Sequence, residues 1–139
     1  MAAAFAHAWL QRNGTDGIWK VISRGLTEDY EPPGSPANPN GVIAMSAYSI
    51  DTSGHVSNIL RRAEVENADI IVGMTTNHIR YIREDFNDMD LSKKLMTLGV
   101  DIQDPWHQPL SEYRHCASQL KEATDDFMDR TFHGPTFKK

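Results

Sequence analysis

The chain has 139 residues, of which 40% are apolar and 24% are charged, which is typical of one globular domain over residues 1–139. A net charge of −5 without a run of lysine and arginine argues against nucleic acid and anionic membranes as main partners. No apolar run approaches membrane-spanning length, and the single cysteine, Cys116, excludes an internal disulfide and fits a reducing cytoplasm.

The first third of the chain predicts a helix, a strand and a loop. Residues 2–12 carry apolar side chains on one helical stripe, and Asn13-Gly14 ends this helix. Residues 18–22 are rich in β-favouring side chains and are bounded by glycine, serine and arginine, which predicts a strand. Residues 26–36 hold three prolines and a glycine, which predicts a loop.

The middle of the chain predicts two helices joined by a turn. Residues 36–48 form the first, capped near Ser35 or Asn38. A turn over residues 51–55 follows, and a short helix is expected over residues 61–67.

The last part of the chain predicts two further strands between helices. Residues 70–74 are a continuous apolar run, as in a strand that is buried on both faces of a parallel sheet. Helices are predicted over residues 75–83, with a threonine cap, and over residues 88–98. A short strand over residues 100–102 then leads to the longest helix, over residues 110–132.

This alternation of strands and helices predicts an α/β fold with a parallel sheet. Three predicted strands are few for five or six helices. Because residues 2–12 begin at once without a capping residue, we expect that an element is missing before Met1.

The segment Val100–Trp106 is the strongest candidate for a site. Asp104, Pro105 and Trp106 follow the predicted strand 100–102, and ligands in α/β folds bind beyond the carboxyl ends of parallel strands. An acid there can transfer a proton, and an aromatic ring can form the wall of a pocket. Taken alone, however, an aspartate followed by a proline more often marks a strand end and a turn than a site.

Several stretches, in this order and spacing, resemble the low-molecular-weight protein tyrosine phosphatase family over nearly the whole chain. The matching stretches are residues 1–5, 23–26, 34–39, 50–55, 68–75 and 103–106. The resemblance implies a three-layer α/β fold, a parallel sheet with helices on both faces, whose first and central strand is missing from this sequence. It also implies phosphotyrosine proteins as substrates, no cofactor, no metal and a cytoplasmic location.

The resemblance assigns a role to five residues. Asp104 is the general acid that protonates the leaving phenolate and then activates water against a phosphocysteine intermediate. Trp106 and Tyr30 are the aromatic walls of the substrate cleft. Ser23 and His55 support the phosphate loop from behind.

The defining motif of the family, a cysteine followed after five residues by arginine, is absent from this sequence. Cys116 does not replace it, because Glu122 stands six residues later and the surrounding segment predicts an uninterrupted helix whose N–H groups are already used. The chain as given therefore has no nucleophile, and we expect it to be inactive.

Three interpretations remain open from the sequence. The true start lies upstream and the full protein is an active tyrosine phosphatase, or the chain is natural and acts as a non-catalytic pseudophosphatase or binding module. The third is a relative of the arsenate reductases, which share the fold but need further cysteines after the third strand, and residues 75–99 contain none. The histidines show no metal-ligand spacing.

Overall fold

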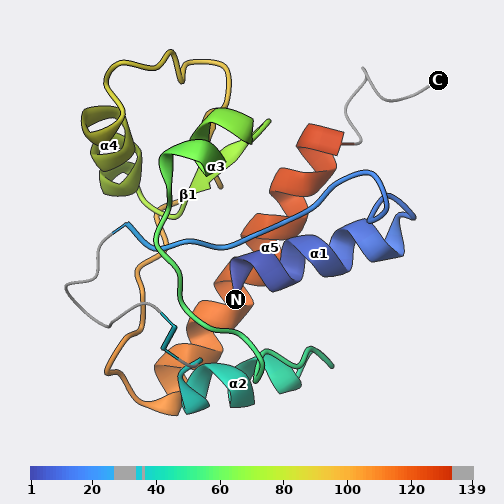
Figure 1. The fold of residues 1–139 in the computed structure, drawn as a ribbon. Helices are drawn as coiled ribbons and strands as arrows, with labels where there is room; N and C mark the ends of the chain where they lie inside the picture. The colour runs from blue at the N-terminus through green and yellow to red at the C-terminus, as the bar shows by residue number, and fades with distance from the viewer. Residues whose placement is uncertain (27–33, 36, 133–139) are drawn as a thin grey trace.

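The computed structural model describes residues 1–26, 34–35 and 37–132. Five helices and two short strands follow one another along the described chain (Figure 1): α1 (Ala2–Arg12), α2 (Pro39–Ser46), α3 (Arg62–Asn67), β1 (Ile71–Gly73), α4 (Thr76–Asp85), β2 (Leu95–Thr97) and α5 (Leu110–Phe132). The α/β fold and the predicted helices at both ends of the chain are confirmed.

The sheet of the described residues consists of β1 and β2, which run parallel with Ile71 opposite Leu95 and Gly73 opposite Thr97. The strand predicted over residues 70–74 is therefore confirmed. The strand predicted over residues 100–102 is wrong, and so is the helix predicted over residues 88–98, because β2 lies within that range. The apolar residues from Leu91 to Leu98 fit a helical stripe, but pairing with β1 gives Leu95 a place in the core.

Residues 18–22 do not form the predicted strand. Their side chains do alternate as in a strand: Trp19 and Val21 pack against the core, whereas Ile18 is 78% exposed and Ile22 is 46% exposed. No ladder within the described residues pairs with this segment, and its first bridge comes later, between Gly25 and Ile59. A strand requires a neighbour for its N–H and C=O groups, and side-chain alternation alone does not supply one.

The side chains of β1 and its flanking residues alternate between two hydrophobic cores. Ile70, Val72 and Met74 pack against the core that α1, α2 and α5 form. Ile71 packs on the opposite face, against the core of α3 and α4. Gly73 lies on this second face as well, because a Cβ there would meet Ile79 of α4 at 2.8 Å. The helices thus cover both faces of the sheet, as the three-layer prediction required.

The long helix α5 organises the first core. It buries one stripe of side chains from Tyr113 to Met128, and α1 and α2 lie against it (Figure 1). Trp9 of α1 is 3% exposed and donates a hydrogen bond from Nε1 to Asp129 Oδ1 of α5 at 2.9 Å. This bond satisfies the indole N–H of a ring that is otherwise buried among apolar groups.

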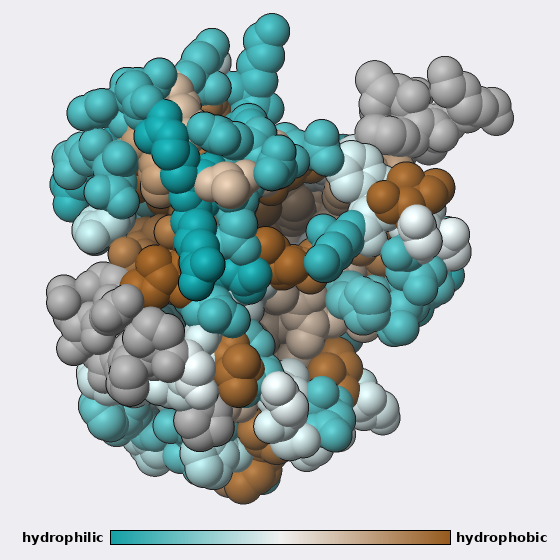
Figure 2. Space-filling model, viewed as in Figure 1, coloured by the Kyte–Doolittle hydropathy of each residue, from teal (hydrophilic) through white to brown (hydrophobic). Residues whose placement is uncertain are grey.

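The surface alternates between polar and apolar regions. Figure 2 shows hydrophilic residues over the end of the molecule that carries α3 and α4, and hydrophobic residues near the centre of the same face. Within the described residues, no helix combines the length and the apolar character that a membrane span requires.

Replacing Gly73 by alanine tests the close contact between β1 and α4. The new methyl group would lie 2.8 Å from Ile79 Cδ1 and 3.2 Å from His78 Cβ, so either the strand or the helix must move. We expect the free energy of unfolding to fall by about 1–3 kcal/mol, measured by urea denaturation followed by circular dichroism. Gly17→Ala is the matched control, because a Cβ at Gly17 meets no atom within 4 Å. Equal stability of the two variants would contradict the contact.

Candidate functional site

The loop that carries Asp104 is attached to the carboxyl end of β1. The backbone N–H of Ile102 donates to the carbonyl of Met74, directly after β1, at 3.1 Å. The carboxylate of Asp101 accepts two hydrogen bonds from the first residue of α4, one from Thr76 N at 3.2 Å and one from Thr76 Oγ1 at 3.1 Å. These bonds place the loop where ligands bind in parallel α/β sheets.

Asp104 begins a tight turn within this loop. Its Oδ1 accepts a hydrogen bond from the backbone N–H of Trp106 at 3.1 Å, and Gln108 N donates to Pro105 O at 2.8 Å. Pro105 is buried whereas Asp104 is exposed, so the turn holds the carboxylate at the surface. The ring of Trp106 lies against that of His107, with 3.7 Å between their centroids.

The carboxylate of Asp104 lies near the first turn of α1. Burial lowers the pKa of the Met1 amino group, while Cys116 and then Asp104 raise it electrostatically. Cys116 lies beside the loop that carries Asp104, because its Sγ donates to the carbonyl oxygen of Gln103 at 3.8 Å. The amino group before α1 therefore lies within electrostatic range of both Cys116 and Asp104.

Cys116 lies in the core rather than in a reactive position. It is 5% exposed and belongs to the buried stripe of α5. Burial raises the pKa of its thiol, the nearby carboxylate of Asp104 raises it further, and the N-terminal amino group lowers it. A thiol with a raised pKa forms little thiolate at neutral pH and is a poor nucleophile.

Ser23 and His55 lie on a different part of the chain from Asp104. The two segments that carry them meet at the bridge between Gly25 and Ile59. His55 is exposed, and its backbone N–H and C=O are bonded to Thr52 and Ala37. The structure thus places Asp104 and Trp106 in one turn. Ser23 and His55 lie on two other segments, which meet at that bridge, and Tyr30 lies outside the described residues.

Sequence reasoning missed Asp101, which caps α4 from 25 residues away. Thr75 is the N-cap and Thr76 the first residue of α4, and no pattern in the sequence indicates that the distant Asp101 bonds to Thr76. Thr75 does cap α4 as predicted, since its Oγ1 accepts from His78 N at 3.3 Å. No cluster of His, Cys, Asp and Glu within the described residues could hold a metal ion.

A family model and a search of curated proteins both match most of the chain. A sequence model described as "Low molecular weight phosphotyrosine protein phosphatase" matches residues 1–133. An arsenate reductase of Staphylococcus aureus (strain Newman) is 26% identical over 125 residues, which is 90% of this chain and 86% of that protein.

Two solved structures share the fold. The low molecular weight protein tyrosine phosphatase of T. tengcongensis is 26% identical, with a TM-score of 0.81 over 93% of this chain and 88% of that one. An arginine phosphatase from Geobacillus stearothermophilus, at 23% identity and a TM-score of 0.79 over 99% of this chain and 90% of that one, shows the fold alone.

Replacing Asp101 by alanine tests the attachment of the acidic loop. The change removes both acceptors of Thr76, and the loss of a helix cap costs about 1 kcal/mol. We expect this decrease in the free energy of unfolding by urea denaturation. The control is Asp69→Ala, an exposed aspartate before β1. An Asp101→Ala variant as stable as its control would show that the two hydrogen bonds contribute nothing.

The raised pKa of Cys116 gives a prediction with a definite sign. The unfolded chain loses its thiol proton first, so the stability that Cys116 contributes is present below about pH 8.5 and declines as the pH rises above it. We therefore expect the wild-type protein to lose more stability between about pH 8 and pH 10 than Cys116→Ala, measured by urea denaturation. Parallel pH profiles of the two proteins would refute the assignment.

Proposed function

Because the chain belongs to the low molecular weight phosphotyrosine protein phosphatase family, we propose that Asp104 is the general acid and base of phosphotyrosine hydrolysis in this fold. The observation that carries the proposal is the attachment of the Asp104 loop to the carboxyl end of β1 and to the N-terminus of α4. An exposed carboxyl group held there can protonate the phenolate that leaves the phosphorus and can then take a proton from water.

The aromatic residues and the support residues take the roles that the family gives to their positions. Trp106 is one wall of the substrate cleft, because it follows Asp104 in the same turn. The family resemblance gives the role of the second wall to the position of Tyr30. Ser23 and His55 would hold a phosphate loop from behind, and the bridge between Gly25 and Ile59 fixes their two segments together.

The sequence does not contain the family's motif of a cysteine nucleophile followed after five residues by a phosphate-binding arginine. The sequence contains one cysteine, and Cys116 has glutamate rather than arginine six residues later. Its burial and raised pKa oppose thiolate formation, so no phosphocysteine forms on it. The proposed state of this chain is therefore a phosphatase fold with an acid and no nucleophile, and non-catalytic binding is the second candidate function.

Arsenate reduction is less well supported than phosphatase ancestry. A disulfide relay passes oxidation between several cysteines, and the single cysteine here cannot form an internal disulfide. We propose that a complete site of this kind acts on cytoplasmic phosphotyrosine proteins.

The first test is the activity of the 139-residue protein. We expect no hydrolysis of para-nitrophenyl phosphate or of a phosphotyrosine peptide above the rate of a heat-denatured sample, measured as released nitrophenolate and phosphate. Catalytic turnover that Asp104→Asn abolishes would show that a nucleophile exists in this chain after all.

The second test adds the cysteine and the arginine that the family's chemistry needs. A first strand and cysteine loop taken from the T. tengcongensis phosphatase are joined ahead of Met1, and phosphate release from a phosphotyrosine peptide is measured. In this chimera we expect Asp104→Asn to lower kcat by about 10²–10⁴-fold, since the tyrosine phenolate, with a pKa of about 10, needs a proton to leave.

The same substitution should matter far less for a dinitrophenyl phosphate, whose leaving group is stable without a proton. Asp69→Asn, which changes an exposed aspartate before β1, is the control for loss of an acidic residue outside this loop. A similar loss of kcat for both substrates would show that Asp104 acts on folding or binding and not as the acid.

A further inference from the structure

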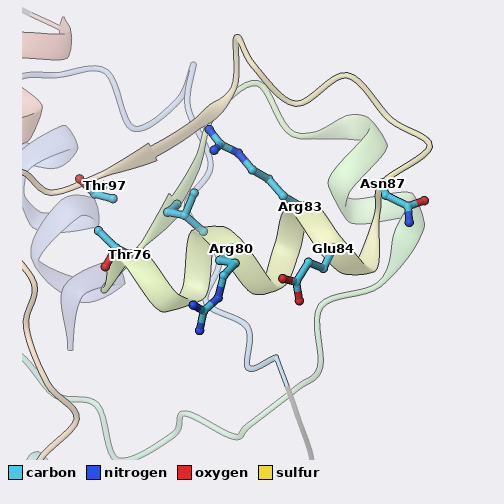
Figure 3. Close-up of a pocket in the computed structure, with 7 residues that line it drawn as sticks. Thr76, Arg80, Arg83, Glu84, Asn87 and Thr97 are labelled. Carbon is cyan, nitrogen blue, oxygen red and sulfur yellow. The ribbon is translucent and has the colours of Figure 1, made fainter.

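The chain turns from β1 into α4 at a corner that residues 74–76 form. Thr76, the first residue of α4, lies at one end of the groove between α4 and β2, and Asn87 lies at the other end (Figure 3). The loop of Asp104 is attached at this corner and not along the groove. A residue that fixes the corner therefore also fixes the loop.

Met74 is bonded through both polar groups of its backbone. Its carbonyl oxygen accepts from Ile102 N at 3.1 Å, two residues before Asp104. Its N–H donates to Nδ1 of His78, in the first turn of α4, at 3.2 Å. The pairing of β1 with β2 ends at Gly73, so these two bonds hold Met74 in place where the sheet no longer does.

His78 is itself fixed in position for this contact. Its backbone N–H donates to Oγ1 of Thr75, the residue that caps α4, at 3.3 Å. Its Cβ lies close to β1, because a Cβ built at Gly73 would stand 3.2 Å from it. The glycine thus lets the imidazole approach the end of the strand. Since Nδ1 accepts the bond from Met74, the proton of the neutral ring lies on Nε2.

We propose that His78 is a positioning residue for Asp104, which holds the N–H of Met74 so that the carbonyl of Met74 keeps the acidic loop in place. The N–H and C=O groups of one residue turn with the same two backbone angles, so the loss of one bond loosens the other. His78 acts through Met74 and Ile102 and not on the substrate. The kinetic consequence rests on the proposed function, in which Asp104 is the acid.

The loop needs both of its attachments to be held in one direction. Asp101 bonds to Thr76 at the start of α4, and Ile102 bonds to Met74 at the end of β1. A general acid must lie within about 2.6–3.2 Å of the atom that it protonates. A misplacement of about 1 Å can lower the rate by about 10²-fold. An Asp104 loop held at Asp101 alone is therefore a weaker acid catalyst.

Two substitutions separate the hydrogen bond from the rest of the side chain. Asparagine carries Oδ1 at the same number of bonds from Cα as Nδ1 of histidine, so His78→Asn keeps an acceptor for Met74 N. His78→Leu removes the acceptor, although leucine is the better helix former of the two. A return of function with asparagine therefore cannot come from helix stability. His7→Leu, at an exposed histidine of α1, is the control for the loss of a histidine elsewhere.

Amide exchange of the 139-residue protein tests the attachment without any catalysis. We expect His78→Leu to speed exchange of the Ile102 amide by about tenfold or more relative to that of Phe86, which bonds to Ile82 at the far end of α4. His78→Asn and His7→Leu should keep the wild-type ratio within about twofold. An unchanged ratio in His78→Leu, or the same change in His78→Asn, overturns the proposal.

The chimera with an added strand and cysteine loop tests the kinetic step. We expect His78→Leu to lower kcat for a phosphotyrosine peptide by about tenfold or more, with KM changed by less than about twofold. The effect on a dinitrophenyl phosphate should be much smaller, and His78→Asn should restore kcat.

The two assignments fail in different ways. If Asp104→Asn is selective for the phosphotyrosine peptide and His78→Leu is not, the role of His78 is refuted while the acid stands. If Asp104→Asn affects both substrates equally, the proposed function fails, and amide exchange of Ile102 still decides whether His78 holds the loop.

Discussion

The burial of β1 on both faces is the constraint on which the rest of the structure depends. Three strand residues cannot form a core alone, so each face must meet helices. Residues 70, 72 and 74 face α1, α2 and α5, while Ile71 and Gly73 face α3 and α4. The lack of a side chain at Gly73 permits the close approach of α4, and the continuous apolar run in the sequence is the direct consequence of serving two cores.

The position of the candidate site follows from this layer. A strand that is covered on both faces leaves its carboxyl end as the place where side chains from different elements can meet. The loop of Asp101 and Asp104 is bonded there to Met74 and Thr76, and the amino group of Met1, before α1, interacts electrostatically with Asp104. The acid is therefore placed by backbone and capping bonds, while its own carboxylate stays exposed.

The sequence alone predicted the helices and caps at positions where the local pattern agrees with the tertiary packing. The caps at Asn38 and Thr75 and the long stripe of α5 were readable because they depend on neighbouring residues. The apolar pattern around Leu95 predicted a helix wrongly. A leucine at this position fits the buried stripe of a helix and the buried face of a strand equally well, and only its pairing with Ile71 decides between them. It failed at residues 18–22 for the converse reason, because side-chain alternation does not reveal whether a neighbouring strand is present.

His78 shows a similar limit of sequence reasoning at the level of function. A histidine in the first turn of α4 fits an ordinary helix face, and only its bond to Met74 N connects it with the loop of Asp104. The same holds for Asp104: its loop shows where an acid is placed, whereas the proposed phosphatase chemistry also needs a nucleophile and a phosphate-binding arginine, which the position of one carboxylate does not reveal.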